Sequence, residues 1–168
     1  GMIYMRGQAR DYDQWRQMGN AGWGWDDVLP IFKCHEDHYR GADDAHGAGG
    51  EWRIEEQRLS WEILDAFRAA CAEIGIPPTE DFNRGDNEGC GYFQVNQRRG
   101  VRWSAADGFL HPVRHRANLA VLTHAQAKQL LFDGKRCTGL EFFHADGKRR
   151  VEAKREVILA SGSIGSPH

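Results

Sequence analysis

The sequence predicts an α+β protein in which short helices and loops are followed by an antiparallel β-meander. Apolar residues recur at helical spacing between residues 61 and 74. Beyond residue 118 the pattern changes to short apolar runs, with Asp-Gly pairs at 133–134 and 146–147. Asp-Gly between apolar runs is typical of a β-hairpin. Twenty glycines in 168 residues indicate many loops and tight turns in what is, by length, one ordinary domain.

The N-terminal part predicts two short helices and a polar loop. Asp11 and Gln14 have the spacing of a capping box, for a helix that ends at Gly19. Asp26 is expected to cap a second helix over residues 27–39, where Pro30 is tolerated because it falls in the first turn. A loop without periodicity follows.

The middle of the chain predicts one long helix between two strands. The strands are expected at residues 51–54 and 92–97, and Ser104 is expected to start another short helix. Ser60 should cap the long helix and Gly75 should end it. Its apolar stripe, which should face the core, consists of Trp61, Leu64, Phe67, Cys71 and Ile74.

Four apolar runs predict the meander: residues 119–122, 129–132, 140–143 and 157–159. The last run, of Val157, Ile158 and Leu159, is interpreted as a buried strand that enters a small-residue turn. Because both ends of the sequence are abrupt, we expect a middle piece of a larger protein.

Composition argues against several classes of function. The net charge of −2 and the pI of about 6.5 exclude the basic surface that nucleic acids require. Apolar runs stay shorter than the roughly 18 residues of a membrane span. The four cysteines are far apart, which predicts reduced thiols and a cytoplasmic protein.

Local motifs favour no self-contained catalytic group. Cys34, His35 and His38 have metal-ligand chemistry, but an exposed charged helix end is the favoured interpretation and no metal is expected. The glycines at 47–50 lack a phosphate-loop or dinucleotide fingerprint. Tyr92 and Phe93 are candidates to line a ligand pocket, although aromatic residues at strand spacing are more often core.

Six motifs, taken together, resemble the glucose–methanol–choline (GMC) family of FAD-dependent oxidoreductases, and most closely its choline and alcohol dehydrogenase branch. They occur in the family's order along the whole chain. They are GMIYMRG at 1–7, DYDQW at 11–15, GWGWDDVLPIFK at 22–33, HGAGG at 46–50, GVRWSAA at 100–106, which DFN at 81–83 and GCGY at 89–92 precede, and RANLAV at 116–121. The closing ASGSIGSP at 160–167 is similar to the family's A-G-A-I-G-S-P turn.

The resemblance implies a set of cofactor contacts and no catalytic residue in this chain. Residues beside the flavin ring would be Gly1, Met2 and Ile3. Ala127 would give backbone hydrogen bonds to the adenine, and Ala160, Ser161 and Gly162 would lie near the ribose and phosphates. The family's G-x-G-x-x-G unit would precede Gly1, and its catalytic His would follow residue 168.

The resemblance also implies a division of the chain and a function. Residues 1–50 would form a flavin-side extended segment with lid helices, 51–117 a substrate-side piece and 118–168 a meander of the FAD domain of a larger two-domain fold. The full-length protein would bind FAD and oxidise a primary alcohol, either choline or an alkanol. Its missing segments would be partners of this chain, and exposed strands would promote self-association. The alternative is a stand-alone, non-catalytic binding module.

Overall fold

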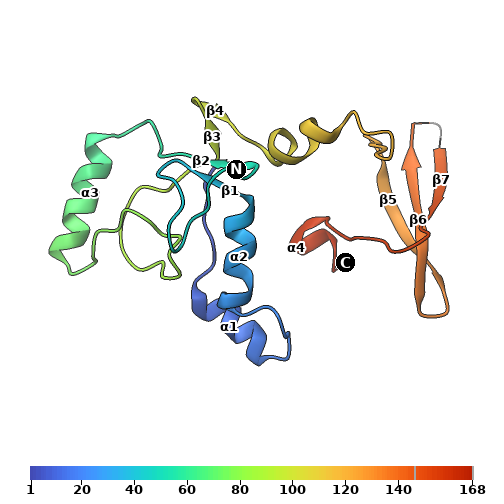
Figure 1. The fold of residues 1–168 in the computed structure, drawn as a ribbon, viewed down its shortest axis with the longest axis horizontal. Coiled ribbons are helices and arrows are strands. Elements are labelled where there is room, and N and C mark those ends of the chain that lie inside the picture. Colours follow the sequence, from blue (N-terminus) through green and yellow to red (C-terminus); the bar gives the residue numbers. More distant parts are fainter. Residues whose placement is uncertain (146, 168) are drawn as a thin grey trace. The chain divides into compact units, whose positions relative to one another are not determined.

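The computed structural model describes residues 1–145 and 147–167, and it confirms the expected α+β class (Figure 1). The chain forms two compact units, Gly1–Arg116 and Ala117–His168. Among the described residues, no helix combines the length and the apolar character that crossing a membrane requires. The division into residues 1–50, 51–117 and 118–168 stays a prediction.

The first unit begins with two helices, α1 (Ala9–Gln17) and α2 (Trp25–His35). Both were predicted, but each starts earlier than expected, because the acidic residue expected as the N-cap lies inside the first turn. The Asp11 carboxylate accepts a hydrogen bond from the Gln8 backbone N–H at 2.8 Å, and Asp27 accepts one from Gly24 at 3.0 Å. Each carboxylate thereby satisfies a backbone donor that the helix leaves free.

Helix α2 is also shorter than the predicted span of 27–39. Its C-terminal continuation is strand β1 (Glu36–His38), which pairs in parallel with β2 (Trp52–Ile54). Burial alternates along β1, so Glu36 and His38 point inward while Asp37 is half-buried. A strand therefore replaces the last turn of the predicted helix because it places two polar side chains in the interior.

Helix α3 (Glu62–Glu73) confirms the predicted long helix and its end at Gly75, which has φ +87°. The predicted cap at Ser60 is wrong, because Trp61 is the N-cap residue and makes no side-chain capping bond. The predicted burial of its stripe is wrong. Only Cys71 is buried, whereas Trp61, Leu64, Phe67 and Ile74 are exposed. Within the described residues, the tertiary contacts of α3 leave most of that face open.

The strand predicted at residues 92–97 is mostly extended backbone with isolated bridges from Val95 to Ile3 and to Glu55. Regular pairing of this described segment begins at its end, where β3 (Gln97–Arg98) pairs with β4 (Val101–Arg102). The helix expected from Ser104 is a π-helical turn, Ala106–Leu110, followed by a 3-10 turn, His111–Val113.

The second unit is a meander of β5 (Gln126–Asp133), β6 (Arg136–His144) and β7 (Gly147–Glu152), in that order in the sheet. The Asp133-Gly134 hairpin is confirmed; of the second predicted turn, Asp146 lies outside the described residues. Short helix α4 (Gly162–Gly165) follows.

Two of the predicted strands in this unit are wrong. Residues 119–122 and 157–159 lie outside strands, and Ile158 is 80% exposed. The third strand is instead β7, which is exposed along its length and has Val151 as its one large apolar residue, so it carries no apolar run.

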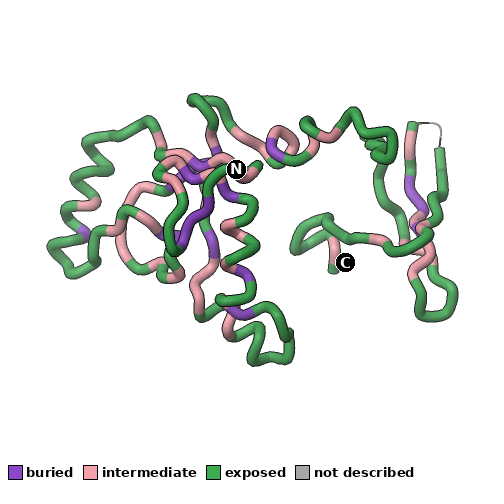
Figure 2. Tube along the Cα trace, in the orientation of Figure 1, coloured by how far each residue is buried: buried purple, intermediate pink, exposed green. Residues whose placement is uncertain are grey.

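Buried residues of the first unit gather around β1, β2 and the extended segments beside them (Figure 2). The apolar core is small and includes Val28, Ala45, Ile54, Phe82 and Val95. Polar residues are buried with them, including Arg6, Glu36, His46, Asn83 and Gln94. A buried polar group is stable only when it is hydrogen-bonded, so these residues must form a network.

Candidate functional site

The centre of the first unit is the Glu36 carboxylate, whose side chain has no exposed surface. Arg6 Nη2 lies 2.7 Å from Oε1, and the Gly47 backbone N–H donates to Oε2 at 2.7 Å. Burial alone would raise the pKa of Glu36, but the hydrogen bonds from His46 and Gly47 and the Arg6 charge lower it below its usual value. Glu36 is therefore an anion that ties the N-terminal segment to α2 and its following loop.

His46 connects this carboxylate to a second one. Its Nδ1 lies 3.1 Å from Glu36 Oε2 and its Nε2 lies 2.7 Å from Asp81 Oδ2. Burial favours the neutral ring, but the hydrogen bonds to Asp81 and Glu36 outweigh it and raise the pKa of His46 to about 9. Both ring nitrogens therefore donate, and His46 is an imidazolium at neutral pH.

The predicted flavin contacts Gly1, Met2 and Ile3 lie in an extended segment that this network holds in place. Asn96 N–H donates to the Met2 carbonyl at 2.6 Å, and Tyr4 N–H donates to the Gln94 carbonyl at 2.8 Å. Ile3 is 58% exposed and Met2 is 37% exposed, so their side chains are available for contact.

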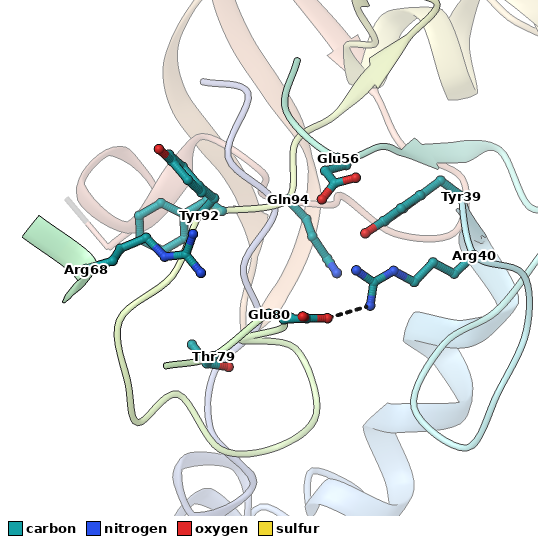
Figure 3. A pocket seen from close by; sticks show the side chains of 9 residues that line it. Tyr39, Arg40, Glu56, Arg68, Thr79, Glu80, Tyr92 and Gln94 are labelled. Atoms are coloured by element: carbon teal, nitrogen blue, oxygen red, sulfur yellow. Dashed lines mark ion pairs between the residues drawn. The ribbon is translucent and has the colours of Figure 1, made fainter. Parts of the chain in front are cut away.

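Tyr92 and Phe93, the predicted substrate-side residues, both line a cavity of about 210 Å³ (Figure 3). The Tyr92 hydroxyl donates to Asp65 Oδ1 at 2.9 Å, and the Phe93 ring lies 5.1 Å from that of Phe82. Because residues 94–96 pair with residues 2–4, the structure brings both groups of candidates to neighbouring stretches of one unit.

The residues of the candidate metal motif have separate partners. His35 Nδ1 lies 3.6 Å from Glu51, whereas the His38 ring stacks on His46 with centroids 3.9 Å apart. Cys34 is exposed. In the part of the chain that the structure describes, no three His, Cys, Asp or Glu side chains converge as metal ligands.

In the second unit, Ala127 lies on the apolar face of the meander. It pairs with Phe142 of β6 and lines an open hollow of about 220 Å³. The rest of that lining is apolar and consists of Leu122, Ala125, Leu140, Phe142 and Val151. Strand β5 is an edge strand, so some of its backbone groups face outward and are free to bind a ligand.

Ala160, Ser161 and Gly162 are exposed and lead into α4. Gly162 has φ +86°, and a Cβ placed on it would meet no atom within 4 Å, so another group can approach its backbone closely. The Ser161 N–H donates to Ser166 Oγ at 2.9 Å, which closes the turn.

The opposite face of β6 carries a charged cluster. Glu141 is fully buried beneath Lys128, Lys148 and Arg150, which approach it to 2.9, 2.8 and 3.1 Å. Hydrogen bonds from Lys128 and Lys148 lower the pKa of Glu141 to about 2. One face of the meander is therefore closed by ion pairs, and the other stays apolar.

Sequence reasoning missed the buried network of Glu36, Asp81, Asn83 and Gln94. Each is a common polar residue without distinctive spacing, and the contacts join residues up to 79 positions apart. His46 in the HGAGG stretch, and Asp81 and Asn83 in the DFN stretch, were singled out as parts of the family resemblance, but none of their contacts was predicted.

Comparisons with known proteins show which family the chain is similar to. The model of the family described as GMC oxidoreductase matches residues 1–168. The chain is 37% identical over 166 residues to mitochondrial choline dehydrogenase of Homo sapiens, covering 99% of this chain and 28% of that protein. It is 38% identical to the oxygen-dependent choline dehydrogenase of Brucella anthropi, of which it covers 30%.

Solved structures show the same similarity. Pyridoxine 4-oxidase from Mesorbium loti matches with a TM-score of 0.80 and 35% identity over 90% of this chain and 30% of that one. An FAD-dependent oxidoreductase from Chaetomium thermophilum matches with a TM-score of 0.89 and 25% identity, over 99% of this chain and 31% of that one. The chain thus spans about 30% of the length of these relatives, and with a family model matched along all its residues it belongs to the GMC oxidoreductase family.

Proposed function

We propose that the full-length protein is an FAD-dependent oxidoreductase that acts on the CH–OH group of a primary alcohol, such as choline or an alkanol. The observation that carries the proposal is the similarity of the whole chain to choline dehydrogenases, at 37% identity over 99% of its length. FAD is the cofactor of the full-length protein, and when bound it accepts a hydride from the alcohol carbon.

The second unit supplies residues that fit the adenosine part of FAD. An apolar hollow lined by Ala127 and Phe142 suits a flat aromatic base, and the free edge of β5 offers backbone hydrogen bonds. The open backbone at Gly162 suits close approach of a ribose or phosphate. The role of this chain in the second unit is to bind and orient.

The first unit supplies residues that fit the reactive side. The segment that follows Gly1 is held on residues 94–96 by backbone hydrogen bonds, and Met2 and Ile3 present exposed side chains. Tyr92 and Phe93 flank that pairing and are proposed to face the substrate side. These residues would position the alcohol and exclude water, while the proton acceptor lies outside the residues described.

The experiment is to purify the full-length protein, measure bound flavin from its visible absorbance, and add choline or 1-alkanols without oxygen. Bleaching of the flavin by one class of alcohol is the expected result. A protein without flavin that shows no redox response would contradict the proposal and would favour the non-catalytic binding module.

Ala127→Asp tests the adenine contact separately. A carboxylate in the apolar hollow is costly to desolvate, so flavin retention should fall by about tenfold. Gln126→Asp is the matched control. Gln126 is exposed, and because adjacent residues on a strand point to opposite faces, its side chain lies on the other face from Ala127. Equal flavin content in both variants would refute the placement of Ala127.

A further inference from the structure

The floor of the cavity in the first unit contains a buried hydrogen-bond donor without an acceptor. Gln94 is 4% exposed and lines the cavity, and Figure 3 shows its amide nitrogen between the two sets of side chains that form the walls. Among the described residues, Gln94 Nε2 has no hydrogen-bond partner. Such a group is costly unless something occupies the cavity and accepts from it.

The orientation of this amide follows from its neighbours. The Arg6 backbone N–H is necessarily a donor, and it bonds Asn83 Oδ1 at 2.7 Å. Asn83 Nδ2 is therefore a donor, and it bonds Gln94 Oε1 at 3.0 Å. Gln94 must then direct its NH₂ group toward the cavity.

His38 lies beside Gln94 and is not among the residues that line the cavity. It is 3% exposed, and the Arg40 backbone N–H donates to its Nδ1 at 3.4 Å. Burial, followed by the charge on His46, lowers the pKa of His38, and a side-chain interaction with Gln94 acts in the opposite direction. An amide NH₂ group has two donors, so Gln94 can face both the ring and the cavity.

The walls carry positive charge on both sides. Arg40 lies over the Tyr39 ring at 5.2 Å, and Arg68 lies over the Tyr92 ring at 5.1 Å. Figure 3 shows these two pairs on opposite sides of Gln94. Arg68 Nε is itself buried without a hydrogen-bond partner among the described residues.

Two acidic residues, Glu56 and Glu80, also line the cavity, but both belong to its exposed rim. Glu80 pairs with Arg40 at 3.5 Å, and its side chain is 80% exposed. The rim is therefore mixed in charge, whereas the buried Gln94 amide presents N–H donors to the cavity. A cation would meet these donors unfavourably, and an acceptor with negative charge would satisfy them.

We propose that this cavity is a binding site for a small carboxylate, whose oxygen accepts from Gln94 while Arg40 and Arg68 compensate its charge. A volume of about 210 Å³ limits the ligand to a few heavy atoms. The site does not depend on the proposed flavin chemistry, because every residue in it belongs to the first unit and its test measures binding alone.

The test is calorimetric titration of the full-length protein with sodium acetate, propionate and butyrate. Acetamide serves as the neutral isostere, and sodium chloride controls for ionic strength. Saturable binding of a carboxylate, at least about tenfold tighter than the matching amide, is the expected result. Equal binding of acetate and acetamide, or no binding of either because water or another segment fills the cavity, would overturn the proposal.

Variants localise the site. Gln94→Glu keeps the oxygen that accepts from Asn83 but replaces the donor with a carboxylate, so acetate should bind about tenfold more weakly. Gln14→Glu makes the same change at an exposed position of α1 and should have no effect. Arg40→Gln, which keeps the fold because Arg40 is half-exposed, should weaken binding about fivefold, and Glu56→Gln should strengthen it by a similar factor. Unchanged affinity in Gln94→Glu and Arg40→Gln together would refute the site.

Discussion

At the scale of single residues, the first unit depends on an ionic network more than on apolar packing. Arg6 and His46 donate to Glu36, and His46 also donates to Asp81. The side chains of Arg6, Glu36 and His46 are each at most 1% exposed. Breaking one member of such a buried set leaves an uncompensated charge, which typically costs about 3–5 kcal/mol. These residues join the N-terminal segment, β1, the following loop and the segment before Asn83.

The network makes stability depend on pH in a predictable direction. The pKa of His46 is raised to about 9 in the folded protein from 6.5, so its stabilising contribution is complete below pH 6.5 and is lost as pH rises through 9. The shift corresponds to about 3 kcal/mol. We expect the urea midpoint of the protein to fall between pH 6 and pH 9.5.

His46→Gln is the reference for this measurement. The pKa values of Glu36 and Asp81 are lowered, so these groups change stability in acid and not in the range of interest. The thiol of Cys71 also has a raised pKa, chiefly through burial, and it contributes equally in both proteins. An equally steep loss of stability in His46→Gln would show that other groups cause the pH dependence.

At the scale of secondary structure, sequence patterns located helices better than strands. Helices α1, α2 and α3 were all expected, since capping residues, periodicity and Gly75 are local signals. Strand β1 was missed because its cause is tertiary, namely the burial of Glu36 and His38. Strand β7 was missed, and residues 157–159 were wrongly assigned, because apolar character does not identify which segment pairs with β6.

The candidate site was predictable only for residues that leave a local signal in the sequence. Tyr92 and Phe93 were candidates to line a pocket, although a core position was the favoured interpretation, and both line the cavity. Their place on the substrate side stays a prediction. Gln94, which makes the buried side of that cavity polar, could not be identified, because the orientation of its amide results from its contact with Asn83. Such long-range hydrogen bonding leaves no periodic pattern in the sequence.

The loop after α2 requires glycine for a reason that the structure defines. A Cβ at Gly47 would overlap the Lys33 carbonyl oxygen, and the Gly47 N–H also donates to Glu36. Neither the Lys33 carbonyl oxygen nor the Glu36 carboxylate can move away easily, because the first belongs to the backbone of α2 and the second to the buried network. Gly47→Ala should therefore destabilise the protein by about 2 kcal/mol or more, measured by urea unfolding.

Ala48→Ser is the matched control for Gly47→Ala. Ala48 is exposed, so this substitution should change the free energy of unfolding by less than about 0.5 kcal/mol. If Gly47→Ala were as stable as Ala48→Ser, the close approach of the loop to α2 would be disproved.

At the scale of the whole molecule, each unit leaves apolar surface open. Helix α3 exposes Ile63 and Phe67 by 70% and 61%, and the meander exposes the hollow beside Ala127. Large contiguous apolar patches on a protein surface are typical of sites that other protein surfaces cover. The chain spans about 30% of the length of its relatives, and the remainder of a full-length protein is proposed to cover these faces.

The 168-residue chain on its own is therefore expected to self-associate, as measured by size-exclusion chromatography with light scattering at increasing concentration. Ile63→Lys combined with Phe67→Lys places two charges on the open face of α3 and should shift the chain toward monomer, because burying a charge opposes association. Ala69→Lys combined with Ala72→Lys adds the same charge on the opposite side of the helix, at two exposed positions, and should leave association unchanged. A monomeric wild-type chain at high concentration, with ordinary cooperative unfolding, would show that these faces do not drive association.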